Sequence, residues 1–294
     1  MNQQFQIIVF TLLRVIPITI HSLGIYLLLT VRFMRRWQRI QSRYHLWLSG
    51  VEILSCFTGI AQLFIQNKDV AFYLLLFSIG FLDIQIVLVL LALTMDRAVF
   101  VWLNMKYESK KIDRAVKSVF VLIFVLAIIS TLLFTFTQNQ NSNLPRKITL
   151  YIYPIMDVCL ITNFFVCYGF IIRTVRKRSQ KLFGIASQLY KNRMRNATLV
   201  PKLIVICGVS FWATVNAVYA AFEITKKEIP LWLSMVLNVM ICLGYSTDAL
   251  LYISFTHSIR EKLKNMFCCF GSGGRPSSNQ QLAITPTRTN STDQ

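Results

Sequence analysis

Seven long, mostly apolar stretches follow one another along this chain, and they constrain its fold more than any other feature. Each is long enough for a helix to cross the hydrocarbon core of a bilayer, which takes ~20 residues. The alternating pattern of a membrane β-barrel is not present. We therefore expect an all-α membrane protein, a seven-transmembrane helix bundle. The stretches are Phe5–Val31, Leu46–Ile65, Val70–Leu103, Val116–Phe136, Ile148–Val175, Leu199–Phe222 and Pro230–Phe255.

The composition excludes a water-soluble fold. Hydrophobic residues make up 55% of the chain and charged residues only 15%, whereas a soluble domain has about 25% charged residues. The net charge of +19 therefore belongs to loops and a tail. Since no soluble domain is expected to carry a basic face, nucleic acid is not an expected partner.

The positions of the Lys and Arg residues predict the orientation in the membrane. Segments 32–43, 97–117, 173–202 and 257–294 carry about five times as many of them as the alternate loops. Such segments stay in the cytoplasm. We therefore expect a plasma-membrane protein with an extracellular N-terminus and a cytoplasmic C-terminus.

Four regions are expected along the chain. They are a short extracellular N-terminus (1–4), the seven-helix bundle (5–256), a short amphipathic helix on the membrane surface (257–270) and a disordered cytoplasmic tail (271–294). The amphipathic helix carries Ile259, Leu263, Met266 and Phe267 on one face. The outer segments are too short to fold into a ligand-capturing domain, so any ligand must enter the bundle.

Two features follow the last span. Cys268 and Cys269 are candidates for palmitoylation, although plain cytosolic cysteines are the alternative. The tail is rich in Ser and Thr, which could be phosphorylated or simply solvated.

Ionisable residues inside apolar spans are costly and mark functional sites. Glu52, Asp83 and Asp248 are expected deep in their helices, and no deep base matches them. They predict a hydrated pocket, a cation site or protonated carboxyl groups, with interhelical hydrogen bonds as the structural alternative. Arg14 and Glu223 lie near the outer ends of their spans, where their side chains could extend toward the interface.

The three histidines are widely separated in the sequence, at positions 21, 45 and 257. No His/carboxylate metal set and no nucleophile–base set is expected from them. We therefore expect neither an enzyme nor a metal site.

An acid–base pair, Asp96-Arg97, stands where the third apolar stretch meets a basic loop. Adjacent residues on a helix point in different directions, so Arg97 can face inward while Asp96 holds its guanidinium from the side. An arginine fork can exchange partners as helices move, which makes the pair a candidate switch. A purely structural ion pair is the alternative.

The chain resembles the rhodopsin-like family of G-protein-coupled receptors over roughly residues 5–270. The resemblance is carried by "DRAVFVWLNMKY" (96–107), "LSGVEIL" (48–54), "FWAT" (211–214), "STDALLY" (246–252) and Pro154. It implies a coupling switch made of Asp96, Arg97, Tyr107, Trp212, Asp248 and Tyr252. It also implies a sodium ion at Glu52 and Asp248, an eighth amphipathic helix, and a heterotrimeric G protein and arrestin as partners, arrestin through the phosphorylated tail.

The sequence departs from the family pattern at several positions. Thr214 and Ala249 replace the prolines of helices 6 and 7, and Phe72 replaces the cysteine of the usual outer disulfide. Melanocortin-type receptors also lack this bridge and have short outer loops.

The ligand class is narrowed by exclusion. By this resemblance, Cys242 stands where opsins carry the lysine that binds retinal, so no retinal is expected. Ile79 stands where amine receptors carry an aspartate. A small, lipid-like or short peptide ligand fits the short outer loops. Each pocket candidate also has a packing interpretation; the candidates are Phe77, Ile79, Asp83, Trp212, Asn216, Tyr219 and Asn238.

The sequence thus predicts a receptor that couples a small extracellular ligand to a heterotrimeric G protein. Two alternatives remain open. One is a non-signalling receptor-like protein that acts as a dimer partner, and the other is a transporter, which the deep acids would favour although no internal repeat is present.

Overall fold

The computed structural model describes residues 3–31, 36–103, 107, 110–140, 151–182 and 184–271. These residues are helical, with short turns and no strand. Among them, seven helical segments are long and apolar enough to cross a membrane, which indicates a multi-pass membrane protein. The helices are α1 (Gln3–Thr30), α2 (Arg36–Phe64), α3 (Lys68–Phe77), η1 (Ser78–Asp83), α4 (Ile84–Leu103), α5 (Lys110–Gln140), α7 (Tyr153–Gln180), α8 (Gly184–Thr225), α9 (Leu231–Phe255) and α10 (His257–Gly271).

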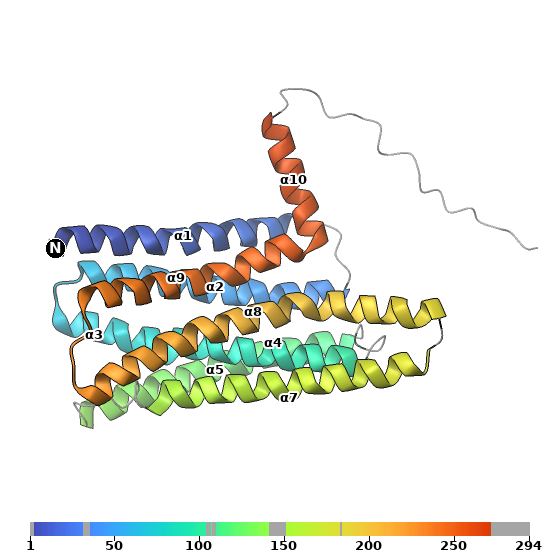
Figure 1. Ribbon diagram of the computed structural model, residues 1–294. Helices are drawn as coiled ribbons and strands as arrows, with labels where there is room; N and C mark the ends of the chain where they lie inside the picture. The colour runs from blue at the N-terminus through green and yellow to red at the C-terminus, as the bar shows by residue number, and fades with distance from the viewer. Residues whose placement is uncertain are drawn as a thin grey trace, which may run out of the picture.

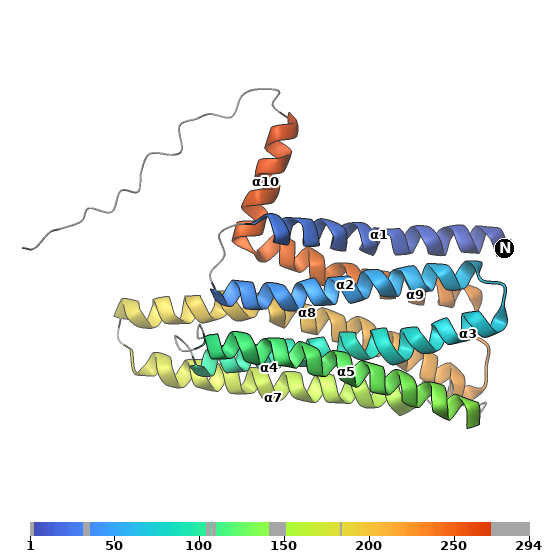
Figure 2. The same ribbon diagram turned by 180° about the vertical axis from the view of Figure 1, so that it is seen from behind.

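The long helices lie side by side (Figures 1 and 2), and the contacts between them form a closed ring. Helix α1 packs against α2 and α9, and contacts continue from α9 through α8, α7 and α4 back to α2. Helix α5 packs outside this ring, against η1 and α4. Helix α10 leaves the bundle at the end opposite the N-terminus (Figure 1).

The outer surface of the bundle is apolar, and several polar and charged side chains are buried within the apolar core. Large apolar side chains such as Leu29 and Phe165 are 71% and 69% exposed, whereas Arg97 and His21 are fully buried. Large exposed apolar surfaces are unstable in water, but they suit the hydrocarbon core of a bilayer. The interior therefore holds the polar chemistry of this chain.

Two helices begin well before their predicted apolar stretches. Helix α2 begins at Arg36 rather than Leu46, and α8 begins at Gly184 rather than Leu199. Lys, Arg and Gln are good helix formers, so polarity ends the membrane segment without ending the helix. With 42 residues, α8 is roughly 60 Å long, about twice the thickness of the hydrocarbon core. The start of the fifth predicted stretch, Ile148, lies outside the described residues.

The third apolar stretch is not one regular α-helix. Its middle, η1, is π-helical from Ser78 to Asp83, and π-helical insertions are frequent at functional sites. Gly80 allows η1 to approach α5, because a Cβ there would lie 2.9 Å from Phe134 Cδ2 and 3.0 Å from Thr131 Cα. The apolar pattern carries no signal of this change in helix type.

Helix α10 docks by its first turns. Ile259 is fully buried, and Leu263 and Met266 pack against the core. The side chains of the palmitoylation candidates Cys268 and Cys269 lie outside the described residues, as does the tail from residue 272.

Candidate functional site

Polar side chains gather in three places inside the bundle: a cavity beside Asp83, a buried cluster around His21, and an enclosed ion pair at Arg97. The three sites follow one another along the length of the bundle, from the end where α1 begins to the end where α4 ends. Each is assembled from several helices.

The Asp83 cavity is a space of about 250 Å³ between α1, α2, α3, η1, α7, α8 and α9. Predicted pocket residues Ile79, Asp83, Trp212, Asn216 and Tyr219 line it, whereas Phe77 and Asn238 do not. The other lining residues are Arg14, Ser55, Gly59, Gln62, Leu75, Ser78, Tyr153, Phe211, Val215, Ile241, Gly244 and Tyr245.

The two predicted residues outside the cavity have local partners instead. Phe77 stacks on Phe81 with ring centroids 5.1 Å apart. The Asn238 amide donates to the Ser234 carbonyl at 2.9 Å within α9. Their packing roles follow from the direction in which each side chain leaves its helix.

Asp83 ends η1 and is 8% exposed. It accepts a hydrogen bond from the Tyr153 hydroxyl at 3.0 Å. The ring of Tyr153 lies 6.3 Å from that of Trp212, and Trp212 lies 6.4 Å from Tyr245. An acid therefore borders a wall of aromatic rings.

Arg14 also lines this cavity, so its side chain turns into the bundle and not toward the interface. Its Nη1 donates to the Ser55 carbonyl at 3.5 Å. The guanidinium occupies the space above Gly59, because a Cβ at that position would overlap it. Because Gly59 of α2 has no side chain, the Arg14 guanidinium can lie inside the bundle.

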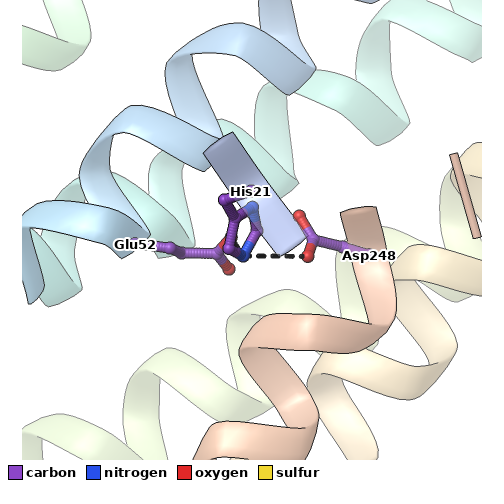
Figure 3. A group of neighbouring side chains, drawn as sticks. All are labelled: His21, Glu52 and Asp248. Atoms are coloured by element: carbon purple, nitrogen blue, oxygen red, sulfur yellow. Dashed lines mark ion pairs between the residues drawn. The ribbon is translucent and has the colours of Figure 1, made fainter. Parts of the chain in front are cut away.

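The second group joins His21 of α1, Glu52 of α2 and Asp248 of α9, which meet at one point (Figure 3). His21 Nε2 lies 3.1 Å from Glu52 Oε2 and 3.7 Å from Asp248 Oδ1. The exposed fractions of the three residues are 0%, 4% and 6%. The prediction that no His/carboxylate set forms is therefore wrong, because three helices bring together residues that are far apart in the sequence.

The His21 ring is fixed on both sides. Nδ1 lies 2.9 Å from Ser49 Oγ, and Nε2 lies 2.5 Å from the Tyr245 carbonyl oxygen. Glu52 Oε2 is buried and lies close to Nε2, but it makes no hydrogen bond to the ring. The ring nitrogen faces more acceptors than one proton can satisfy.

The donor set of this group bears on the predicted sodium ion. One atom from each of the three residues lies within 4.8 Å of the others. Glu52 and Asp248 do lie at one site, but the third donor is an imidazole nitrogen. Imidazole with carboxylates suits zinc and similar transition metals, whereas purely oxygen sites suit harder cations. The residues present therefore fit a transition metal better than sodium.

The third group encloses the guanidinium of Arg97, which is fully buried. Its Nε donates to Asp96 Oδ2 at 3.0 Å, its Nη2 also donates to that oxygen, and Nη2 lies 3.2 Å from the Tyr107 hydroxyl. Tyr107 donates in turn to Asp96 Oδ1 at 2.5 Å. The three side chains form a closed hydrogen-bonded set, which we call the Arg97 clasp.

Aromatic faces complete the clasp. The guanidinium carbon lies 5.4 Å from the Phe100 ring centroid and 5.8 Å from that of Tyr107, within cation–π range. Burial raises the pKa of Tyr107 well above its ordinary value, so its hydroxyl remains a proton donor. The sequence pointed to Asp96 and Arg97, and the resemblance added Tyr107.

A larger cavity of about 970 Å³ lies beside the clasp, between α2, α8, α9 and α10. Gln41 and Tyr252 line it, with basic groups from Arg260 and His257. Gln41 Oε1 also accepts from Arg97 Nη1 at 3.5 Å, which links this Gln41 cavity to the clasp. Sequence reasoning missed the cavity because it depends on the separation of helices.

The remaining predicted switch residues are distributed between these sites. Trp212 lines the Asp83 cavity, and Asp248 belongs to the His21 group. Tyr252 lines the Gln41 cavity and packs against His45, with the two tilted rings 3.7 Å apart between centroids.

Comparison with known proteins does not assign the chain to a family: no protein-family model matches it, and no curated protein gives a significant match. Its class must therefore be inferred from its own residues. Seven apolar helices around polar internal sites indicate a multi-pass helical membrane protein.

Proposed function

We propose that this protein is a plasma-membrane receptor of the G-protein-coupled type. In this proposal the Asp83 cavity opens toward the extracellular side and takes a small ligand, and a heterotrimeric G protein engages the Gln41 cavity. The observation that carries the proposal is the Arg97 clasp, a fully buried arginine held by Asp96 and Tyr107 beside a large cavity at the opposite end from the ligand site.

The chemistry of the clasp suits a switch. An arginine fork offers several donors in a fixed plane and can exchange one acceptor for another. In the described state the Arg97 guanidinium donates hydrogen bonds to Asp96, Tyr107 and Gln41. A partner that enters the Gln41 cavity would offer new acceptors, and binding would favour the state in which Arg97 is released.

Helix α9 gives a physical route between the two cavities. Tyr245, Asp248 and Tyr252 are spaced by three and four residues, so they lie on one face of the helix. Tyr245 lines the Asp83 cavity and accepts from His21, Asp248 faces His21, and Tyr252 lines the Gln41 cavity. A small rotation of α9 would change all three sites together.

In this proposal the clasp and α10 lie on the cytoplasmic side, which the Lys and Arg bias of the loops favours. There, α10 would lie on the membrane surface, anchored by palmitate on Cys268 and Cys269. Phosphorylation of the tail would recruit arrestin.

A second candidate function is proton- or metal-coupled transport. The His21 group favours it, because a buried histidine between two carboxylates at a three-helix junction resembles the proton relays of pumps and transporters. Wild-type protein in liposomes that carries a proton or zinc flux, lost in His21→Ala, would favour transport over signalling.

The test is basal G-protein activation in transfected cells across a panel of Gα subtypes, at matched surface expression. Asp96→Asn weakens the clasp and is expected to raise the basal signal, whereas Arg97→Ala is expected to abolish it. Arg114→Ala, which removes an exposed arginine on α5, serves as the control and is expected to match wild type. If Asp96→Asn gives no signal above Arg97→Ala on any subtype, the non-signalling alternative replaces the receptor proposal.

A further inference from the structure

The Asp83 cavity is walled by one base and one acid that do not pair with each other. Arg14 and Asp83 both line it, yet within the described part of the chain no ion pair joins them at 4.0 Å or less. We propose that the ligand of this cavity is a small zwitterion of amino-acid type, with its anionic group at Arg14 and its ammonium group at Asp83. This inference deepens the proposed receptor function and rests on the cavity being its ligand site.

The guanidinium of Arg14 has donors to spare. Arginine carries five N–H donors, and the hydrogen bond that the described residues give it is one long contact of 3.5 Å to the Ser55 carbonyl. A charged group without strong partners inside an apolar bundle is costly. A carboxylate or similar anion in the cavity would accept two of the free donors side by side.

Asp83 offers the complementary end. It is 8% exposed, and one hydrogen bond, from Tyr153 at 3.0 Å, reaches it from the described residues. A carboxylate has room for several more donors. The neighbouring rings of Tyr153, Trp212 and Tyr245 can also face an ammonium group, which binds favourably to aromatic faces.

A ligand with a single charge fits this cavity less well. A simple amine would satisfy Asp83 and leave Arg14 without an anion, and a fatty acid would do the reverse. A molecule carrying both charges stabilises both walls at once. The volume of about 250 Å³ lies below the roughly 300–1,000 Å³ of sites for drug-sized ligands, so an amino acid or a compound of similar size is favoured over a lipid.

A substitution at Gly59 tests independently whether Arg14 binds the anionic group of the ligand. Its hydrogen is the only substituent that leaves space for the Arg14 guanidinium, since a Cβ would overlap it. Gly59→Ala is therefore expected to displace Arg14 from the cavity wall without altering any charge. Gly50→Ala is the matched control on the same helix, because a Cβ at Gly50 meets no atom within 4 Å.

The experiment measures ligand binding to the purified full chain in lipid nanodiscs by the shift in Tm. The probes are the natural amino acids, short β- and γ-amino acids, and for each the amine without the carboxylate and the acid without the amine. At least one zwitterion is expected to raise Tm with an affinity tenfold or more above both of its singly charged analogues. Because binding is measured without a G protein, the two proposals can fail separately. A zwitterion that binds but activates no Gα subtype in cells would overturn the receptor proposal and leave the ligand assignment intact.

The variants assign the two ends. Arg14→Gln and Gly59→Ala are expected to reduce the affinity for the zwitterion to that of its amine, and Asp83→Asn to that of its acid, while Gly50→Ala binds as wild type does. The melting temperature of each ligand-free variant shows whether it is folded. If no zwitterion binds more tightly than its analogues, or if Arg14→Gln and Gly59→Ala both bind as wild type, the assignment is wrong.

Discussion

Arg14 and Arg97 both lie in apolar, membrane-length helices, and the bundle treats them in opposite ways. Arg97 is fully buried and held by Asp96, Tyr107 and two aromatic faces. Arg14 faces a cavity, and its one hydrogen bond to the described residues, to the Ser55 carbonyl, is 3.5 Å long. A charge satisfied by its own chain fixes the structure, whereas a charge left with free donors is available to a ligand.

The two sites also differ in how they are assembled. The Arg97 clasp uses residues within one stretch of chain, 96–107. The setting of Arg14 depends on Ser55 and Gly59 of another helix. Substitutions at the first site should therefore change stability and coupling, and substitutions at the second should change ligand binding.

The largest expected effect is that of Asp96→Ala. It removes the charged partner of Arg97 and leaves a buried guanidinium unpaired, which typically costs 3–5 kcal/mol of stability. Thermal unfolding of the purified protein, followed by tryptophan fluorescence, would show a large fall in Tm relative to wild type. An unchanged Tm would mean that the clasp is not formed in the resting protein.

Gly80→Val should have an intermediate effect. Its side chain would meet the Thr131 backbone and the Phe134 ring, and overpacking of this kind typically costs 1–3 kcal/mol. Since η1 carries Asp83, ligand affinity should fall as well, with basal coupling through Arg97 unchanged. Equal losses of both readouts would show that the two ends are not separable.

Tyr107→Phe should cost about 1 kcal/mol, the typical value of a hydrogen bond, because it removes the 2.5 Å bond to Asp96. The pH dependence of this difference follows from the raised pKa of Tyr107. Above about pH 10 the unfolded tyrosine loses its proton while the folded one keeps it. The stability contributed by Tyr107 is therefore complete below that pH and declines above it, so the Tm of wild type should fall toward that of Tyr107→Phe in alkaline buffer.

The smallest effect on stability is expected for Arg14→Gln, within about 0.5 kcal/mol of wild type. Its one hydrogen bond to the described residues is 3.5 Å long, and the loss of that bond is offset because a charge without strong partners is itself costly in an apolar bundle. Calorimetry of the ligand-free protein checks this, with Asp96→Ala as the reference for a large loss. A destabilisation similar to that of Asp96→Ala would show that Arg14 is structural and would remove the contrast between the two arginines.

The sequence alone determined the all-helical, multi-pass architecture, because crossing a bilayer is a local requirement of each segment. About twenty apolar residues satisfy it without reference to any other helix. The pair Asp96-Arg97 could be recognised for the same reason, since its two residues are adjacent. The sequence placed the starts of α2 and α8 too late, because polar residues extend both helices before their apolar stretches begin.

Only the tertiary structure decided which polar side chains meet. In a membrane helix the lipid-facing and core-facing sides are both apolar, so the sequence carries little periodicity that reports the rotation of each helix. That rotation brings His21 to Glu52 and Asp248, and it sets Gly59 beside Arg14. The cavity between Arg14 and Asp83 therefore depends on how the helices pack against one another, which the sequence of a single helix does not determine.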